Sequence, residues 1–477
     1  MAPEPALAES IAAVATSAYR DGVPAAVATS VRSRVLDTLG ICVASHRLET
    51  SRAAIEHVLA QGGTPQAHIV GVATLVPAAL AAFANGVLAH SLDYDDTHLP
   101  SVLHPSATVI PAALAAAQAA GADGTHTVRA IAVGLEITVR LGMAGYDRAL
   151  GNSVFYEHGQ HATSICGALG ASVSAALLLG LDEEGVRNTL GINASMASGI
   201  IEGNRTGGTG QRMHCGWAAQ SALTAADLVA RGFTGPPTVL EGRFGFFEAF
   251  LRGQANAEEV TDGLGTSWSV PGIFFKPYPA NHFTHAAIDA GMALRARGVR
   301  PDDIASMRLG VPSSVVRTIG QPIEAKRAPL TGYQAQFSGP YAVVAGLLGG
   351  GGLGVGLDDF TDELAKDPRR RSLMARVEVV GDERCDAIFP AQFPAILTAT
   401  LTDGSEVTAE VLANRGGPRR PLSDAELALK FRDCAGRYLD DDQIDTVYSR
   451  VMDLGEGPDA GAVLEPLAAL ASPAETA

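Results

Sequence analysis

The sequence has few cysteines, few charged residues and no excess of positive charge, and each shortage excludes a class of protein. Its five cysteines are widely spaced and form no CxxC pair, which favours a reducing compartment and argues against a disulfide framework or structural zinc. Charged residues make up 18% of the 477 residues and hydrophobic residues 47%, so the chain is neither disordered nor a highly charged scaffold. The net charge of −16 repels nucleic acids and anionic membrane surfaces, and we expect neither as a partner.

The sequence also lacks an export signal and a strong membrane span. The N-terminal segment carries Glu4 and Glu9 where a signal peptide would carry basic residues, which predicts a cytoplasmic location. The most membrane-like stretch, residues 163–181, is uncharged but rich in glycine, alanine and serine. It is therefore weaker than a spanning helix should be, and we predict a helix buried on all sides within protein.

The first part of the chain has the hydrophobic spacing of α-helices. Residues 30–44 place apolar side chains on one stripe, and residues 77–92 and 110–120 are alanine-rich and nearly uncharged, as in the central helices of a bundle. Glu136 precedes Arg140 by four residues, a spacing that pairs the two on one helix face. We expect this ion pair at the protein surface.

The pattern changes after residue 265. Residues 306–311 and 375–380 have the alternation of β-strands, and residues 396–412 read as a hairpin turning at Asp403-Gly404. We therefore predict a mainly α fold. Its expected parts are a large all-helical domain at 1–265, a smaller α+β domain at 266–412 and a C-terminal helical segment at 413–477 that packs back on the first domain.

Histidines gather in four short segments, and this is the main functional signal. The first segment lies between two apolar helices, where isolated charges would be costly to bury. It therefore lines a cleft, or its aspartates merely cap helices, or its dense histidines and carboxylates bind a metal such as iron, manganese or zinc. Its polar residues are His90, Asp93, Asp95, Asp96, Thr97, His98 and His104.

The second and third segments add further histidines. Tyr156, His158 and His161 come just before the predicted buried helix, where a helix N-terminus would favour an anion. The third segment is glycine-rich and is either a solvated basic loop or a backbone that bends close to a ligand. It contributes Arg205, Gln211, Arg212 and His214.

The fourth segment lies at the junction between the predicted domains, a favoured place for pockets. Lys276 stands among phenylalanines and a proline, so it either extends to solvent or is partly desolvated and useful as a cation or acid–base group. Tyr278, Asn281, His282 and His285 follow. The four segments together supply cations for a substrate with two or three carboxylates, and near-neutral groups for proton removal beside a carboxylate. We expect them to converge on one cavity.

The same segments resemble, in order and spacing, the MmgE/PrpD family, which includes 2-methylcitrate dehydratases, cis-aconitate decarboxylases and iminodisuccinate epimerases. The likeness runs from about residue 10 to about residue 455. The motifs that carry it are ANGVLAHSLDYDDTHLPSVLHPSATVIPAALA, GQHATSICGALGASVSAALLLGL, MHCGWAAQSALTAADLVARGFTGP and KPYPANHFTHAAIDA.

The resemblance implies a helical domain with a smaller α+β lid domain, a homodimer, and chemistry without a metal or organic cofactor. It disfavours the metal interpretation of the first segment. Matched residue by residue, it assigns catalytic roles to Asp93, His104, His161 and Lys276. Thr97 and His285 also align with family positions.

The sequence departs from the family pattern at two positions. Gln211, with Arg212 beside it, stands where many members carry a lysine, which weakens the case for a third substrate carboxylate unless Arg212 turns inward. Asn281 stands where the decarboxylases place a histidine, which argues against decarboxylation. Tyr156, His214 and His282 complete the candidate substrate-binding residues.

The leading hypothesis is a cofactor-independent lyase that dehydrates a small β-hydroxy di- or tricarboxylate such as 2-methylcitrate, or catalyses the reverse hydration. One alternative is an epimerase or isomerase that exchanges a proton α to a carboxylate. Another is a cis-aconitate-type decarboxylase. A non-catalytic carboxylate-binding relative is the fourth alternative, because Gln211 and Asn281 are not the residues that the family motif has there.

Overall fold

The computed structural model describes residues 5–203, 208–456 and 461–470, and the chain forms two compact units. Unit 1 consists of Met1–Ser91, Asp95–Ile273 and Cys434–Ala477. Unit 2 consists of Leu92–Tyr94 and Phe274–Asp433. The second unit thus begins and ends later than the range 266–412 expected from the sequence, and it includes a short piece of the first histidine segment.

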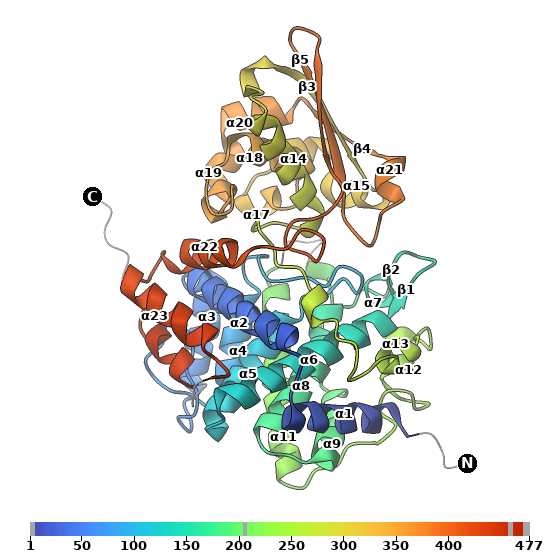
Figure 1. The fold of residues 1–477 in the computed structure, drawn as a ribbon, viewed down its shortest axis with the longest axis vertical. Helices are drawn as coiled ribbons and strands as arrows, with labels where there is room; N and C mark the ends of the chain where they lie inside the picture. Colours follow the sequence, from blue (N-terminus) through green and yellow to red (C-terminus); the bar gives the residue numbers. More distant parts are fainter. Residues whose placement is uncertain (1–4, 204–207, 457–460, 471–477) are drawn as a thin grey trace. The chain divides into compact units, whose positions relative to one another are not determined.

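Unit 1 is helical except for a two-stranded ribbon of β1 (Tyr146–Asp147) and β2 (Asn152–Ser153) among its described residues (Figure 1). Its longer helices agree with the predicted mainly α class. They are α1 (Leu7–Asp21), α2 (Ala25–Ser45), α3 (Glu49–Gln61), α4 (Ala78–Ala89), α5 (Ser106–Ala120), α6 (Gly124–Ala144), α8 (Ala162–Leu178), α9 (Glu183–Asn193), α11 (Gln211–Ala230) and α23 (Asp441–Met452). The shorter ones are α7 (Val154–Glu157), α12 (Phe246–Leu251), α13 (Glu258–Thr261), η1 (Val270–Gly272), η5 (Gly461–Val463) and η6 (Glu465–Leu467).

Helix α8 is the centre of unit 1. Every one of its residues is buried, and it packs against α5, α6, α9 and α11. This confirms the prediction of a helix enclosed by protein. Its glycines and alanines let neighbouring helices approach, and at Gly170 the backbone lies against Thr138 and the Gly134 carbonyl of α6.

The expected surface position of the Glu136–Arg140 pair was wrong. The two side chains do pair, with Arg140 Nε donating to Glu136 Oε1 at 2.7 Å, but both are buried. Arg140 also donates to the carbonyls of Val260, Asp262 and Ser267. The spacing specifies a shared helix face, whereas the segment 260–267 that covers this face comes from far along the chain.

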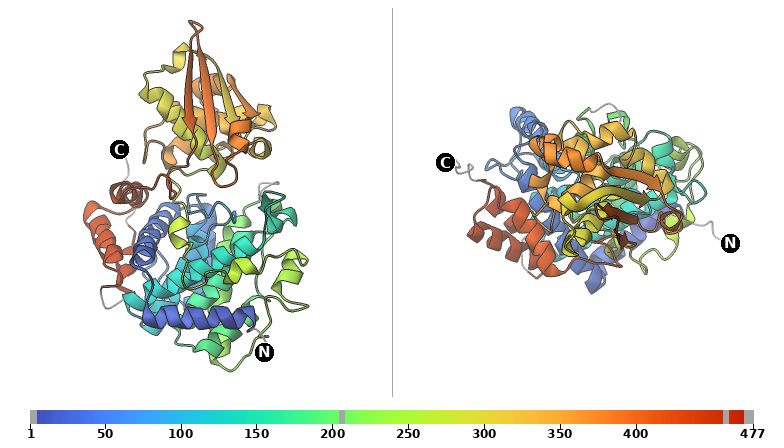
Figure 2. Two further views of the ribbon diagram at one scale, coloured as in Figure 1. Left: turned by 45° about the vertical axis from the view of Figure 1, so that its right-hand side comes forward. Right: turned by 90° about the horizontal axis from the view of Figure 1, so that it is seen from above.

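Unit 2 is built on a four-stranded sheet in the order β4-β3-β5-β6 (Figure 2). Strands β3 (Ile304–Val311) and β4 (Val377–Gly381) are parallel, and the predicted hairpin forms antiparallel β5 (Ala395–Leu401) and β6 (Glu406–Val411). Helix α14 (His285–Ala296) packs on β5 and β6, and α18 (Gly339–Leu348) packs on α14. Their apolar side chains form one core with the sheet.

Shorter helices and turns complete unit 2, and the chain returns to unit 1 within α22 (Asp424–Ala435), at Cys434. The remaining elements are η2 (His282–Thr284), η3 (Pro301–Asp303), α15 (Ser313–Ile319), α16 (Ile323–Arg327), α17 (Gly332–Ala335), η4 (Leu357–Phe360), α19 (Asp362–Lys366), α20 (Pro368–Met374) and α21 (Glu383–Asp386).

The five cysteines are all free and buried, in agreement with the expectation of no disulfide framework. Within the described residues, no helix combines the length and apolar character that crossing a bilayer requires.

The close contact of α6 and α8 gives a test of the packing. A Cβ added at Gly170 would overlap Thr138 Oγ1 and the Gly134 carbonyl oxygen, and a backbone atom cannot swing aside. We expect Gly170→Ala to lower the free energy of unfolding by about 1–3 kcal/mol, measured by urea denaturation. The control is Gly272→Ala in the same unit, where nothing lies within 4 Å of the added Cβ. An equal effect of both substitutions would contradict the packing argument.

Candidate active site

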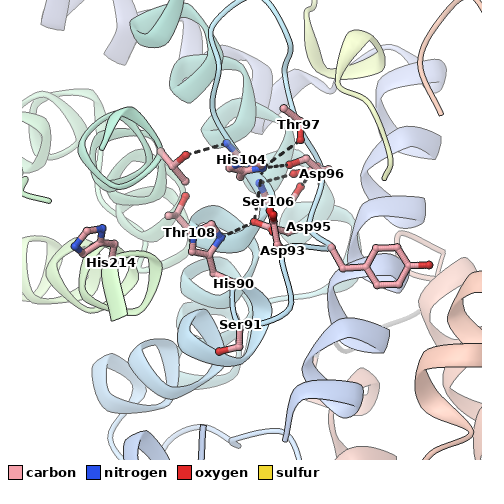
Figure 3. A network of polar contacts seen from close by, with 12 residues as sticks. His90, Ser91, Asp93, Asp95, Asp96, Thr97, His104, Ser106, Thr108 and His214 are labelled. Atoms are coloured by element: carbon pink, nitrogen blue, oxygen red, sulfur yellow. Dashed lines mark hydrogen bonds and ion pairs between the residues drawn. The ribbon is translucent and has the colours of Figure 1, made fainter. Parts of the chain in front are cut away.

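The first histidine segment forms a buried polar cluster in unit 1 (Figure 3). His90, at the C-terminal end of α4, pairs through Nδ1 with Asp95 Oδ2 at 2.7 Å. The Nδ1 atom of His104 lies 4.0 Å from the same carboxylate oxygen. The rings of His90 and His104 are 5.6 Å apart. Asp95 is therefore the acid around which the two histidines are arranged.

The hydrogen bonds of His104 fix its tautomer. Its Nδ1 lies 2.7 Å from the carbonyl oxygen of Asp96 and 3.2 Å from Thr97 Oγ1. A carbonyl oxygen can only accept, so Nδ1 carries a hydrogen and the neutral ring has its lone pair on Nε2. The side chain of His104 is 18% exposed, unlike the more deeply buried His90. His104 thus offers a basic nitrogen on a ring that is partly exposed.

The second and third segments meet the first in the same cluster. His161 precedes the first turn of α8, and its Nδ1 lies 3.0 Å from Nδ1 of His214 on α11. The His161 ring is 5.6 Å from His90 and 5.0 Å from His214. The backbone N–H of His104 also donates to Thr163 Oγ1 of α8. The tertiary structure therefore brings His90, His104, His161 and His214 together.

The environments of these rings drive their pKa values apart. Burial alone would lower the pKa of His90, but its neighbours Cys215 and Asp95 raise it well above the usual histidine value. Burial, and then the charges of neighbouring histidines, lower the pKa of His161 well below that value. Burial and the charge of His90 lower the pKa of His214 to about 4. The pKa of one buried histidine is thus raised beside two whose pKa values are lowered, an arrangement found where acid and base roles are divided.

Unit 2 contains a second group of candidate residues. Asp93 has a left-handed backbone with φ 52°, a conformation that costs a residue with a side chain about 1–2 kcal/mol. Lys276, only 1% exposed, donates to the Asp93 carbonyl at 2.9 Å and to Asp93 Oδ1 at 2.5 Å. One buried ammonium group therefore holds both the backbone and the carboxylate of Asp93 in place.

The histidines that follow Lys276 are buried in unit 2. The ring of His282 stacks on that of His285 at 4.5 Å, and His285 Nε2 lies 3.0 Å from the Ala280 carbonyl oxygen. Burial and the charges of Lys276 and Lys430 lower the pKa of His285 to about 3. His285 is therefore a neutral ring next to two cations.

The Asn281 side-chain oxygen accepts from the backbone N–H of Phe283 and caps η2.

The remaining candidates lie in unit 1 with partners of their own. Arg212 Nη1 donates to Thr50 Oγ1 of α3 at 3.0 Å. Gln211 is the half-buried first residue of α11, and Tyr156 is a half-buried residue of α7. Arg205 falls outside the described residues.

Sequence reasoning did not select His90 and Asp95 as site residues, although both belong to the first segment. Three aspartates stand within four positions there, and a sequence cannot tell which one faces a histidine. The available signal was a histidine at the end of an apolar helix followed by these three aspartates, and it does not single out Asp95. Among the described residues, no three His, Cys, Asp or Glu side chains are arranged as a metal-binding group.

The lowered pKa of His214 predicts a pH dependence of stability. The folded protein keeps this ring neutral down to about pH 4, whereas the unfolded chain takes up a proton near pH 6.5. The contribution of this group to the free energy of unfolding is complete above its pKa in the unfolded chain. It is lost as the pH falls toward the pKa in the folded protein. The wild type should therefore lose unfolding free energy between about pH 6.5 and about pH 4.5. We expect this loss to be about 2 kcal/mol smaller in His214→Gln.

Urea denaturation at the two pH values measures this difference. His57→Gln, at an exposed position on α3, is the control and should leave the pH dependence as it is. A wild-type pH dependence in the His214 variant would contradict the assignment of a neutral buried ring.

The comparisons with known proteins agree over nearly the whole chain. The model of the MmgE/PrpD N-terminal domain matches residues 9–259, and that of the MmgE/PrpD C-terminal domain matches residues 278–454. Cis-aconitate decarboxylase of Homo sapiens is 29% identical over 465 residues, which cover 93% of this chain and 90% of the relative. Cis-aconitate decarboxylase of Aspergillus terreus is 24% identical over 468 residues, 94% of each chain.

A relative of another activity matches a shorter region. The mitochondrial 2-methylcitrate dehydratase of Yarrowia lipolytica is 30% identical over 176 residues, 35% of this chain and 32% of the relative. The names of these relatives are those of enzymes, and they differ in reaction. With both domain models matched along the chain, the protein belongs to the MmgE/PrpD family.

Proposed function

We propose that this protein is a lyase that acts on a small di- or tricarboxylate by proton transfer through the histidine cluster of unit 1. The observation that carries the proposal is the buried group around Asp95, in which the pKa of His90 is raised and those of His161 and His214 are lowered. Such division of pKa values marks functional sites more often than structural ones.

In this proposal His104 is the general base. Its Nδ1 is bound to the Asp96 carbonyl, so the lone pair of the neutral ring lies on Nε2, and the ring is more exposed than that of His90 beside Asp95. It takes the proton from the carbon next to a substrate carboxylate. The charge that develops there is stabilised by fixed cations, a role that suits His90 on account of its raised pKa.

With a β-hydroxy acid as substrate, removal of this proton is coupled to loss of the hydroxyl group. As the C–H electron pair forms the new double bond, the C–O bond breaks, and the departing hydroxide takes a proton from a second histidine to leave as water. A positioned acid or base typically contributes a factor of about 10² to 10⁴ in rate. Lys276 is proposed to bind a carboxylate, and Asp93, its ion-pair partner, is proposed to take part in the proton exchange.

Decarboxylation is the second candidate. The near full-length similarity to cis-aconitate decarboxylases favours it. Asn281 argues against it, because an amide that caps η2 through its oxygen cannot carry a proton at neutral pH as a histidine would. Both reactions pass a proton between a protein group and the carbon beside a carboxylate, but dehydration removes this proton, whereas decarboxylation delivers it after carbon dioxide has left.

Proton NMR in deuterated water separates these possibilities in one experiment. The purified protein is mixed with citrate, methylcitrate, aconitate, tartrate or iminodisuccinate. We expect an alkene signal with loss of the hydroxy acid, or the reverse. Carbon dioxide release with aconitate would establish decarboxylation instead, and deuterium uptake without loss of water would establish epimerisation. Stabilisation by these acids with unchanged spectra would leave a carboxylate-binding protein and refute the lyase.

The proposed base gives the first mutational prediction. His104→Ala should lower kcat by a factor of about 10² to 10⁴, because the proton acceptor is removed, while the far-ultraviolet circular dichroism stays as in the wild type. His126→Ala is the matched control, since His126 pairs with Asp123 at the start of α6 away from the cluster. Turnover within a factor of two of the wild type would remove His104 from the mechanism.

The second mutational prediction concerns the buried lysine. Lys276→Ala should lower kcat/KM at least 10²-fold, because a buried cation is lost and Asp93 no longer has its partner. Lys366→Ala at the exposed end of α19 is the control in the same unit. Steady-state kinetics with the substrate found by NMR measures both, and equal values for the two variants would exclude a role for Lys276.

A further inference from the structure

A buried arginine outside the four histidine segments holds the loop that carries His104. Arg34, in the middle of α2, is 1% exposed. Its Nη1 donates to Asp96 Oδ2 at 2.7 Å, and its Nη2 donates to the carbonyl oxygens of Ile273 at 2.7 Å and Val270 at 3.2 Å. Its guanidinium therefore joins segments that are far apart in the chain.

Asp96 passes this constraint on to His104. Its carboxylate accepts from both the backbone N–H and the hydroxyl of Ser106, at 3.2 and 2.5 Å. Asp96 and Ser106 are the two ends of the loop that contains Thr97 and His104 (Figure 3). The carbonyl oxygen of Asp96 is also the acceptor for His104 Nδ1. One carboxylate thus closes the loop, and the same residue sets the tautomer of the ring.

The Nη2 group of Arg34 affects the fourth segment indirectly, because the Ile273 carbonyl that it holds lies just before that segment in the sequence. Ile273 is the last residue of unit 1 in that part of the sequence, and Lys276 follows shortly after it. Holding the Ile273 carbonyl fixes the point from which that segment leaves unit 1. An arginine suits this arrangement, because its planar guanidinium presents several donors in a rigid fork, whereas a lysine carries one compact ammonium group on a flexible stem.

We propose that Arg34 is a positioning residue for the reaction. It acts through Asp96, by keeping the His104 ring in the Nδ1–H tautomer, which places the lone pair of the neutral ring on Nε2. This role deepens the proposed function and rests on it, although the tautomer itself can be observed without a substrate. A misplacement of a reacting group by about 1 Å can lower the rate about 10²-fold. A change at Arg34 that shifts His104 through this hydrogen-bond network should therefore lower the rate of the reaction.

The chain offers a closely matched control. Arg140 is also a buried arginine in unit 1, is paired with an acid, Glu136, and donates to carbonyls of a remote segment. None of these contacts involves the histidine cluster. Arg34→Lys and Arg140→Lys each keep the positive charge and remove the fork, so both should lower the midpoint of thermal unfolding to a similar degree.

The activity arm compares these two variants. We expect Arg34→Lys to lower kcat by 10-fold to 100-fold with KM changed less than about 3-fold, because proton transfer is affected more than binding. Arg140→Lys should keep the wild-type kcat. Equal kcat values in the two variants at matched stability would overturn the proposal.

The second arm measures the tautomer without any substrate. Nitrogen-15 NMR of histidine-labelled protein, with the His104 signals assigned by their loss in His104→Gln, should show a protonated Nδ1 and a bare Nε2 in the wild type. Arg34→Lys should shift this ring toward a mixture of tautomers, while Arg140→Lys should not. An unchanged His104 spectrum in folded Arg34→Lys would refute the positioning role. Should the wild type turn over none of the tested acids, the proposed function fails while this arm still decides the role of Arg34.

Discussion

Two adjacent carboxylates buried in unit 1 place a constraint on the loop around them, because an ionised acid away from water needs a cation and hydrogen-bond donors. Asp95 is matched by His90 and Asp96 by Arg34. The two pairs attach the loop to two different helices, because His90 lies at the end of α4 and Arg34 lies in α2. Breaking either pair would leave a buried charge, and this is the reason why the loop keeps a single arrangement.

The histidine cluster depends equally on how closely the helices approach. A Cβ added at Gly86 of α4 would come within 2.7 Å of the Gly216 Cα atom of α11. Gly86 lies one turn before His90, and Gly216 directly follows Cys215 and His214. Contact between the two helices at these glycines therefore brings their histidines within range of each other. These glycines thus determine how closely the two helices that carry the histidines approach each other.

Local pattern predicted the strands of the unit 2 sheet and several central helices of unit 1, and the reasons are visible in particular elements. Helix α8 has no charged side chain and is enclosed on every side, and the β5–β6 hairpin turns at Asp403-Gly404 as its sequence indicates. The Glu136–Arg140 pair was wrongly expected at the surface, because the spacing shows which residues meet but not which segment covers them. The choice of Asp95 as the partner of His90 was equally beyond the sequence, since it depends on the path of the backbone.

The sequence by itself determined the family, the mainly α class and the short segments in which the chemistry is concentrated, because residue types and their order are local information. The tertiary structure alone decided which acid each cation meets: Asp93 with Lys276, Asp95 with His90 and Asp96 with Arg34. Those partners are separated by 183, 5 and 62 residues. Folding brings the two distant pairs into contact and selects one of three nearby aspartates for His90, and these contacts, together with burial, set the charge that each group carries.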